Sequence, residues 1–587
     1  MKTVSWKKIK ENLIFLPGIV LLAVWPCAVH MDTVKTGLED YPWYPSLVTQ
    51  EDFFMHVRSL FLLFLALWML ICIAVQIRRY REEKKRTGQF WPLLVYEGFA
   101  VLSALFSVNR EFSFHGIVEQ YEHIGVLLAY GIVAVYFYFT CGDRGKGIFR
   151  GALLAGAAIQ CVIGFTQLTG NDFWNSSLGR WLILLGRRGG TDYYSVFGEE
   201  SSGQVYLSFY HPNYAAVYLL LVLSSAVAAA WCARKVWQKA AALLLTASLL
   251  ICLWGTGSKT AALVLPAVIL LGGLLALPGK RWRIRFSALW LLGIMTAAAM
   301  AFLLPGTTFL KEIGSSIIPE RQIYALEEVS LAEEGIYVTW NENRLLLFME
   351  EEEGKTYFSV LGADGNGLPM NYDPETGHFT LLSEGGELEF EAYTEDENFW
   401  IIMYQGEIPW YFTKSSEDTS WKYINLYQKP DTPENAPAAF GKGYESALSG
   451  RVYLWSRSLP LLGQHLLLGS GPDTFPLIFP QNDYVTRANV GLDMLMPVIS
   501  KVHSLYLQIA LQTGMISLAA LLVFWIRYFL HGRKIMKRKG QSREEIIWES
   551  AGLVSVAGFL LMGITNDSVV AVSPVFWALL GMGYSRK

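Results

Sequence analysis

The sequence predicts an all-α polytopic membrane protein with about twelve transmembrane helices and an extracytoplasmic β-rich insertion. Three observations support this fold class. The 587 residues are 52% hydrophobic and only 17% charged, a balance that soluble proteins of this size rarely show. Apolar runs of about 17 to 25 residues, long enough to cross a hydrocarbon core, recur along most of the chain. Between about residues 306 and 502 such runs stop, and acidic, glycine and proline residues become common.

These observations divide the chain into four parts. Residues 1–305 form an N-terminal transmembrane bundle of about nine helices, and residues 503–587 add about three more. Between them lie the β-rich insertion with its linker, 306–440, and an extracytoplasmic helical loop region, 441–502. The candidate spans are about 12–30, 53–77, 91–108, 123–140, 151–169, 211–232, 240–255, 260–277, 286–304, 503–526, 546–565 and 569–584.

Basic residues between the spans set the orientation. Counting spans from the N-terminus places every lysine- and arginine-rich loop on one side, which the positive-inside rule assigns to the cytoplasm. Both termini are then cytoplasmic, and the insertion faces away from the cytoplasm at a plasma or inner membrane. The basic clusters lie at 7–10, 78–86, 144–150, 234–239, 280–285 and 533–539.

Charge and cysteine content exclude several classes of function. The formal net charge of −3 gives no sign of a nucleic-acid partner. All six cysteines lie in or beside apolar segments, so a disulfide framework in the insertion is excluded. The outer histidines and carboxylates show no metal-ligand spacing, so we expect neither a metal nor another cofactor.

Alternating apolar and polar residues predict strands within the insertion. The strands cover 335–348, 356–361, 378–390 and 399–412, with glycine-containing turns between them. From residue 444 to 468 the pattern becomes helical. Several aromatic residues could stack on sugars, although strand aromatics more often pack in a core. They are Trp400, Trp410, Tyr411, Trp421 and Tyr423.

Five stretches on the predicted outer face hold polar residues that are costly to place beside lipid. The first contains Arg187 and Arg188 followed by two glycines, which suits an anionic ligand or lipid headgroups. The second, 210–214, opens a span with a proline in the first helical turn. There His211 or Asn213 either caps the helix or faces a cavity.

The other three stretches follow along the chain. The hairpin at 257–260 presents the hydroxyl of Ser258 and the cation Lys259, but it lacks the spacing of a nucleotide-binding loop. Arg451 and Trp455 are one helical turn apart and share a face. His503 begins a span, where a histidine acts either as a cap or as a reactive group in contact with water.

In this order, the stretches resemble the superfamily of O-antigen ligases and O-antigen polymerases, which are membrane glycosyltransferases. His211-Pro212-Asn213 is similar to its Asn-Pro-Asn-like element, and Gly257-Ser258-Lys259-Thr260 to its Gly-Ser-Arg-Thr-like hairpin. The segments 450–455, 464–472 and 503–507 resemble its Gly-Arg-x-x-x-Trp helix, its glycine-containing turn and its His-Ser element. Lys259 replaces an arginine and loses bidentate geometry. The β-rich insertion has no counterpart in the minimal family pattern.

The resemblance implies a GT-C-like enzyme that transfers a glycan from a polyprenyl diphosphate carrier to an acceptor hydroxyl on a glycan, lipid or protein. It implies inversion at the anomeric carbon, no metal, and a position at the membrane lipid surface. His503 would orient or deprotonate the acceptor, and cations would meet the charge of the leaving diphosphate. The implied catalytic residues are His503 and Arg451, and the implied substrate-binding residues are Arg187, Arg188, His211, Asn213, Ser258, Lys259 and Trp455.

Two other functions stay open. A transporter or flippase of the same carrier-linked glycan would share the layout of about twelve spans, with Glu97 as its clearest buried carboxylate. The repeated halves typical of transporters are not evident in the sequence. A sensor would instead bind wall glycans through the β-rich module. Within the enzyme hypothesis, ligase and polymerase differ only in the acceptor, which the sequence does not identify.

Overall fold

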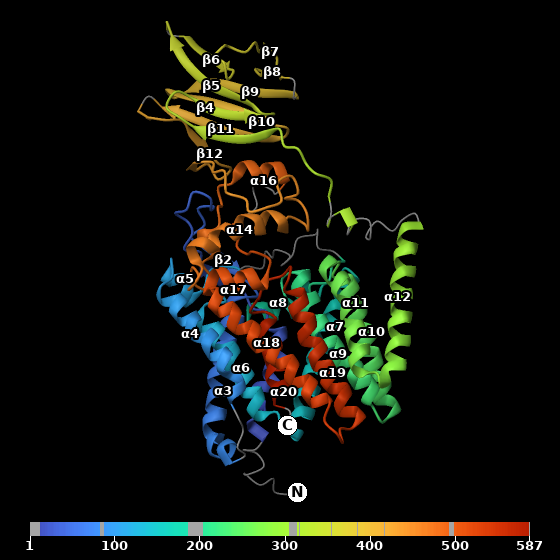
Figure 1. The fold of residues 1–587 in the computed structure, drawn as a ribbon. Coiled ribbons are helices and arrows are strands. Elements are labelled where there is room, and N and C mark those ends of the chain that lie inside the picture. The colour runs from blue at the N-terminus through green and yellow to red at the C-terminus, as the bar shows by residue number, and fades with distance from the viewer. Residues whose placement is uncertain are drawn as a thin grey trace.

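A bundle of helices carries a small β-domain at one end (Figure 1). The computed structural model describes residues 12–82, 87–185, 203–303, 314–315, 317, 319–353, 355–383, 386–415, 417–491 and 498–585. In this part of the chain, seven helices are long and apolar enough to cross a membrane, and Leu16–Cys27 and Ile124–Thr140 form shorter apolar helices. The mostly helical, multi-pass membrane protein predicted from hydropathy is therefore confirmed, while the total of about twelve spans stays a prediction.

The helices lie where apolar runs predict them, with short helical turns between some of them. The N-terminal segment changes helix type along its length, from α2 (Leu16–Ile19) through η1 (Val20–Val24) to η2 (Trp25–Cys27). The others are α3 (His56–Glu82), η3 (Gly88–Phe90), α4 (Trp91–Leu105), α5 (Arg110–His115), α6 (Ile124–Thr140), α7 (Asp143–Leu168), η4 (Phe173–Asn175), α8 (Ser177–Leu184), α9 (Pro212–Cys232), α10 (Val236–Gly255), α11 (Lys259–Ala276), α12 (Gly279–Leu303), α14 (Arg451–His465), α15 (Phe475–Ile478), α16 (Tyr484–Val490), α17 (Leu505–Thr513), α18 (Met515–Met536), α19 (Arg543–Met562) and α20 (Ser573–Tyr584).

The predicted single span at 503–526 is wrong, because two helices occupy it. α17 ends at Thr513 and α18 begins at Met515. Gly514 between them has φ 91°, and a Cβ atom there would clash with the carbonyl oxygen of Leu467. Glycine permits this conformation and this close approach. Hydropathy could not reveal the break, since apolar residues continue on both sides of it.

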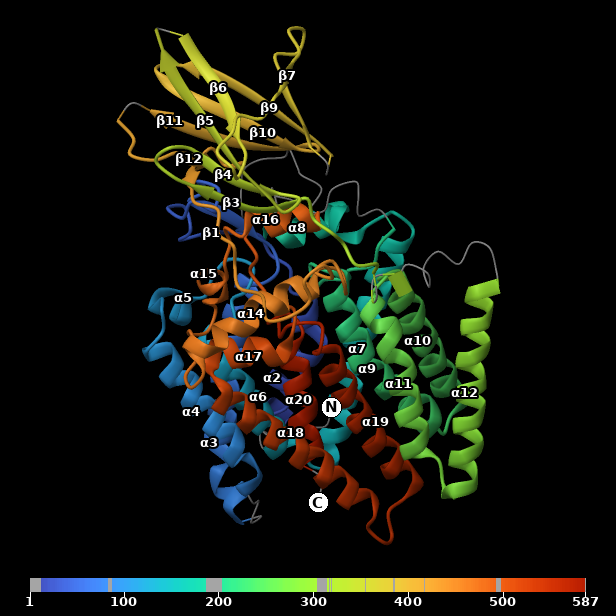
Figure 2. The same cartoon turned by 45° about the horizontal axis from the view of Figure 1, so that its top comes forward.

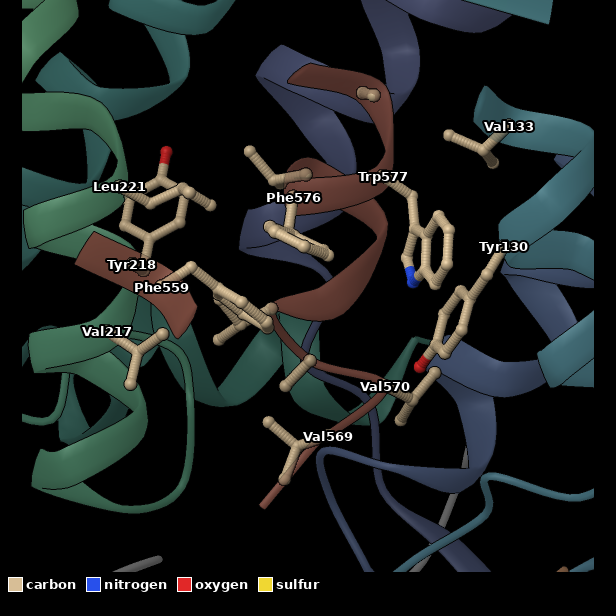
Figure 3. Close-up of a cluster of buried hydrophobic side chains, with 14 of the residues drawn as sticks. Tyr130, Val133, Val217, Tyr218, Leu221, Phe559, Val569, Val570, Phe576 and Trp577 are labelled. Carbon is tan, nitrogen blue, oxygen red and sulfur yellow. The ribbon is translucent and has the colours of Figure 1, made fainter. Parts of the chain in front are cut away.

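Buried aromatic side chains hold the C-terminal helices against the N-terminal ones (Figure 3). Tyr130 of α6 stacks on Trp577 of α20 with ring centroids 6.1 Å apart. Phe559 of α19 stacks on Phe576 of α20 at 4.0 Å, close to the buried Tyr218 of α9. Large aromatic side chains contribute strongly to core energetics. This packing fixes the short connection between α19 and α20, which reaches the candidate site.

The β-domain consists of two antiparallel sheets that share one hydrophobic core. Phe358 of one sheet contacts Phe379 and Phe390 of the other, with ring centroids 5.3 and 5.5 Å apart. The four-stranded sheet is ordered β3 (Leu326–Leu331), β4 (Ile336–Trp340), β5 (Asn343–Glu352), β6 (Lys355–Leu361). The seven-stranded sheet is ordered β13 (Pro430–Asp431), β12 (Lys422–Ile424), β11 (Ile408–Ser415), β10 (Asn398–Gln405), β9 (Gly386–Glu395), β8 (Phe379–Ser383), β7 (Asn371–Tyr372).

The predicted β-rich insertion is confirmed, but two of its predicted strands are hairpins. The segment 335–348 contains β4 and most of β5, which turn at Asn341 and Glu342 with φ values of 48° and 65°. Such turns usually contain glycine, so the sequence gives little sign of them. The segment 399–412 likewise contains parts of two strands, β10 and β11. The segment 378–390 also contains two strands, but there the glycines at 385 and 386 predict a turn, and β8 ends at Ser383 while β9 begins at Gly386. Of the predicted stacking residues, Trp410, Trp421 and Tyr423 are buried in the core, whereas Trp400 and Tyr411 are partly exposed.

The β-domain is fixed to the end of the bundle. α16 packs into the β-domain core through Tyr484, and α14 and α16 lie between the sheets and the membrane helices (Figure 2). Lys429 Nζ donates to the carbonyls of Glu39 and Tyr41, at 2.6 and 3.1 Å. These two acceptors lie between β1 (Asp32–Lys35) and β2 (Thr49–Asp52), a ribbon next to α3. The β-domain is thus held directly over the helix ends.

Candidate active site

His503 stands just before α17 in a strained backbone conformation. Its φ of 53° is uncommon for a residue other than glycine and persists only where the surroundings hold it. Here the connection between α19 and α20 supplies that support. The Leu505 N–H, two residues on, donates to the carbonyls of Gly563 and Asn566, both at 2.8 Å. The strained residue turns the chain into α17 and sets the direction of the imidazole.

Asp567 pairs with the imidazole of His503. Oδ2 of Asp567 lies 2.9 Å from Nδ1 of His503, and Oδ1 accepts from the Ser504 N–H at 3.2 Å. The Asp567 side chain is fully buried, whereas that of His503 is 41% exposed. A carboxylate at this distance keeps the proton on Nδ1, so Nε2 carries the lone pair. The pair therefore presents a solvent-accessible base that is oriented from behind.

α14 brings Arg451 and Trp455 to the same region. Arg451 Nε donates to the Thr565 carbonyl at 2.8 Å and Nη1 donates to the Leu448 carbonyl at 3.1 Å. Trp455 Nε1 donates to the carbonyl of His503 at 3.4 Å. The one-turn spacing therefore places both side chains against the segments that hold the His503–Asp567 pair. The two carbonyls fix the plane of the guanidinium group.

Caps of two membrane helices complete this end of the bundle. The His211 side chain caps α9 by accepting from the Asn213 N–H at 3.1 Å. Asn213 Oδ1 in turn accepts from Ser258 Oγ at 2.7 Å, and Ser258 caps α11. Two residues on, Thr260 Oγ1 lies 2.9 Å from Thr565 Oγ1. Side-chain hydrogen bonds thus join the start of α9 to the start of α11. Thr260 extends this connection to Thr565, whose carbonyl accepts from Arg451.

Buried polar groups hold the segment that leads to His211. Arg58 is fully buried and donates from Nη2 to the carbonyls of Pro26 and Ser208, at 2.8 and 2.5 Å. Gln167 Oε1 accepts from the Leu207 N–H at 2.7 Å. These hydrogen bonds favour one backbone path, although Nε and Nη1 of Arg58 are buried without a hydrogen-bond partner among the described residues. The position of His211 therefore depends on three helices outside its own motif.

Lys501 adds a second cation beside the His503–Asp567 pair. Its Nζ donates to Tyr214 Oη at 3.0 Å and lies 5.0 Å from the centre of that ring. Burial opposes the charge, but Tyr214, Asp567 and Glu119 outweigh it and raise the pKa of Lys501. Burial raises the pKa of Glu119, while Lys501 opposes that change. Lys501 therefore stays protonated at any physiological pH.

The cations act together on His211. His211 is exposed, yet desolvation of its ring by the surrounding protein, together with the charges of His503, Lys501 and Arg451, lowers the pKa of His211 to about 4. A neutral ring is also what the cap requires, since Nδ1 must accept the Asn213 N–H. His211 thus serves as a neutral polar group in an electropositive site suited to an anionic ligand.

The structure brings most of the predicted site residues together. His503, Trp455 and Arg451 surround the connection between α19 and α20. His211, Asn213 and Ser258 form the adjoining caps, and Lys259 follows as the first residue of α11 with a half-buried side chain. The predicted anion-binding residues Arg187 and Arg188 lie outside the described residues. Within the described part of the chain, no group of three or more His, Cys, Asp or Glu residues could hold a metal ion.

Comparison with known families identifies the helical region of this site. Residues 412–522 match the model of the family described as O-Antigen ligase. The chain carries an O-antigen ligase domain. No curated protein matches the chain. The O-antigen ligase match includes Arg451, Trp455 and His503, and it confirms the resemblance seen in the sequence. It points to a glycosyltransferase-like membrane enzyme, and the family implies ligation of glycans from a lipid carrier.

The O-antigen ligase motifs alone do not reveal two residues of this site. Asp567 lies outside the matched segment, 64 positions after its partner His503. Its only sequence signal is a carboxylate in a short turn between two apolar spans, where a charge is costly. Lys501 lies within the match, two positions before His503, but its contact with Tyr214 depends on the packing of α9.

Proposed function

We propose that this protein transfers a glycan from a polyprenyl diphosphate carrier to an acceptor hydroxyl, at the extracytoplasmic surface of the cell membrane. The observation that carries the proposal is the His503–Asp567 pair, whose carboxylate interacts with the cations Arg451 and Lys501. A polarised imidazole suits proton abstraction from a hydroxyl. Nearby fixed cations suit a diphosphate leaving group.

The proposed reaction is a single displacement. Nε2 of His503 takes the proton from the acceptor hydroxyl. At the same time the hydroxyl oxygen forms a bond to the anomeric carbon of the donor glycan. The bond from that carbon to the carrier's diphosphate oxygen breaks, and the diphosphate leaves with the bonding electrons. Asp567 stabilises the imidazolium that forms, while Arg451 and Lys501 stabilise the negative charge on the leaving group. Attack opposite the leaving group inverts the anomeric configuration.

The positions of the other predicted site residues suggest a role for each of them in binding the substrates. Lys259 begins α11 next to the cap residue Ser258, and we assign it to the same anionic group as Arg451. His211, Asn213 and Ser258 shape the rim through their caps, and Trp455 holds the backbone of His503. Arg187 and Arg188 are further candidates for binding the diphosphate. The proposal needs no metal ion, because the chain's own cations meet the charge.

The proposed orientation agrees with the distribution of basic residues. The site lies at the start of α9 and the start of α11. The opposite end of α9 is followed by the basic cluster 234–239, and α18 ends with Arg533 and Lys534 in its last turn. The positive-inside rule assigns those opposite ends to the cytoplasm. The site and the β-domain then lie on the side where a flipped carrier-linked glycan is accessible.

A reconstituted transfer reaction tests this proposal. Purified protein in lipid nanodiscs is incubated with a carrier-linked glycan and a fluorescent acceptor glycan, and products are identified by mass spectrometry. We expect a product whose mass is the sum of the two glycans less water, together with free carrier diphosphate. NMR of the new linkage should show inverted configuration. Movement of the donor across a vesicle bilayer without a joined product would instead support a transporter.

The transporter alternative receives less support from the structure. Its clearest sequence feature was Glu97, a carboxylate in α4. The Glu97 carboxylate packs directly against Gly131 of α6, where a Cβ atom would clash with Oε1. A small residue that admits a carboxyl at a helix contact is a packing arrangement. It favours a structural role for Glu97.

A further inference from the structure

A polar cavity of about 720 Å³ lies where the β-domain meets the helical region. One wall is formed by β3 and the β4–β5 turn, including Glu328 and Glu342. The opposite wall is the linker that leads to α14, including Phe440 and Lys442. A pocket of this size falls within the range of ligand-binding sites. It is separate from the His503–Asp567 pair, which does not line it.

Fixed, buried charges form part of the cavity lining. Arg457 of α14 and Glu445 are 5% and 3% exposed, and Arg457 Nη1 lies 3.6 Å from Glu445 Oε1. Arg457 also donates from Nε to Asp483 Oδ2 at 3.1 Å and from Nη2 to Thr486 Oγ1 at 3.0 Å. Tyr324 Oη donates to Glu445 Oε2 at 3.2 Å. These hydrogen bonds hold the lining in place before any ligand binds, which lowers the entropic cost of binding.

The exposed lining suits a ligand rich in hydroxyl groups. Three basic and four acidic side chains line the cavity, so it has no strong preference for an anion or a cation. Carboxylates such as Glu328 accept hydrogen bonds from hydroxyls, and Lys442 donates to them. Phe440 is 44% exposed and offers an apolar ring face. Hydrogen-bonding groups of both kinds beside an exposed aromatic ring match the polar edges and apolar faces of a sugar.

α14 connects the cavity to the reacting groups. Arg451 and Trp455 face the His503 region, whereas Arg457 lines the cavity. Arg457 follows Arg451 by six positions, which is about 9 Å along the helix and about 120° around it. One rigid helix thus carries a reaction-site residue on one face and a cavity residue on another.

We propose that this cavity binds the acceptor glycan, with the reacting end of that glycan extending past α14 to His503. This inference rests on the proposed transfer reaction. The donor is already held at the membrane by its lipid and its diphosphate. An acceptor glycan that carries no lipid has no such anchor, so it gains most from a binding site of its own. The β-domain and its linker, which supply most of the cavity wall, would then select the acceptor.

The test measures acceptor binding separately from transfer. The probe is a fluorescein-labelled oligosaccharide released from the surface glycan of the source cells, titrated by fluorescence anisotropy against the full-length protein in nanodiscs. The variant combines Glu328→Ala with Phe440→Ala, two exposed residues whose loss should not unfold the protein. The matched control combines Glu350→Ala with Tyr357→Ala, an exposed acidic and aromatic pair directly opposite each other on β5 and β6.

We expect the cavity variant to raise the probe Kd about tenfold and the control to leave it unchanged. The acceptor KM should rise by about the same factor while the donor KM stays constant. Equal Kd values for wild type and cavity variant, or no saturable binding by wild type, would overturn the inference. So would a raised Kd with an unchanged acceptor KM.

The same assays separate this inference from the proposed function. His503→Ala should abolish transfer and leave the probe Kd at the wild-type value. If His503→Ala still transfers glycan at the wild-type rate, the proposed function fails, and the Kd comparison still decides whether the cavity binds a glycan. If His503→Ala is inactive but the cavity variant behaves as wild type, only the acceptor site is refuted.

Discussion

Nδ1 of His503 lies 2.9 Å from Oδ2 of Asp567, although the two residues are 64 positions apart in the chain. The contact joins the start of α17 to the turn between α19 and α20. It converts a histidine with strained backbone into an oriented base whose side chain is 41% exposed. The reactivity of His503 therefore depends on the packing of the last two helices.

The first prediction concerns Asp567. Asp567→Asn keeps the shape of the side chain but removes the charge that stabilises an imidazolium, and it no longer fixes the proton on Nδ1. We expect kcat for glycan transfer to fall about 10²- to 10⁴-fold with little change in donor KM. Steady-state kinetics in nanodiscs measures both constants. A variant with wild-type kcat would refute the role of this pair.

Arg451 provides a test of charge against geometry. Arg451→Ala should lower kcat about 10²- to 10³-fold, as expected when one preorganised group stabilising transition-state charge is removed. Arg451→Lys should recover only part of this loss, since an ammonium cannot donate to the Thr565 and Leu448 carbonyls and to an anion in the same plane. The control is Arg281→Ala, an exposed arginine of α12. Full activity in Arg451→Lys would show that charge alone suffices.

Lys501 is expected to bind the donor's diphosphate both before and during the departure of the carrier. Lys501→Met keeps the aliphatic length that packs on Tyr214 but removes the positive charge. We expect the donor KM to rise at least about tenfold, with the acceptor KM unchanged. Lys239→Met, an exposed lysine of α10, serves as the control. If neither the donor KM nor kcat changes in Lys501→Met, this lysine is structural.

The pH dependence of stability is expected to reflect His123, which caps α6. Its Nδ1 accepts from the Gly125 N–H at 3.2 Å, and burial, helped by His115 and His56, lowers the pKa of His123 to about 4. The unfolded chain binds this proton near pH 6.5, so between about pH 6.5 and 4 the unfolded state holds more protons than the folded state. The contribution of His123 to the free energy of unfolding is therefore complete above pH 6.5. It is lost as the pH falls towards 4, by at most about 3 kcal/mol.

The comparison with His123→Asn isolates this contribution. Asparagine can cap a helix but does not titrate. Buried carboxyl groups affect both proteins equally, so the difference between their melting temperatures should change as the pH is lowered from 7 to 4.5. The wild type should lose more stability than the variant. Parallel curves over this range would exclude His123 as the cause.

The sequence predicts the membrane fold well because the bilayer imposes a simple rule on each helix. An apolar run of sufficient length becomes a span whatever its neighbours are. The break at Gly514 escapes this rule, since it depends on the close approach of the Leu467 carbonyl from another segment. The hairpin turn at Asn341 and Glu342 also escapes prediction, because residues other than glycine adopt the left-handed conformation there.

Some residues of the candidate site can likewise be predicted from the sequence, and others cannot. Residues inside local motifs, such as His503 and the Arg451–Trp455 face of α14, can be proposed from spacing and from the family resemblance. Asp567 and the contact of Lys501 with Tyr214 arise only when helices distant in sequence pack together. The α19–α20 connection carries no motif, so its carboxylate acquires a role only through its three-dimensional position.

The most direct test of the account is single-turnover transfer by His503→Ala. Wild type and variant, both in nanodiscs and in excess over the carrier-linked glycan, are mixed with that donor and saturating acceptor, and joined product is followed by mass spectrometry. We predict that the variant loses at least about 10²-fold in rate, while its binding of the donor is unchanged. A variant that forms joined product at the wild-type rate would contradict the assignment of His503 as the base.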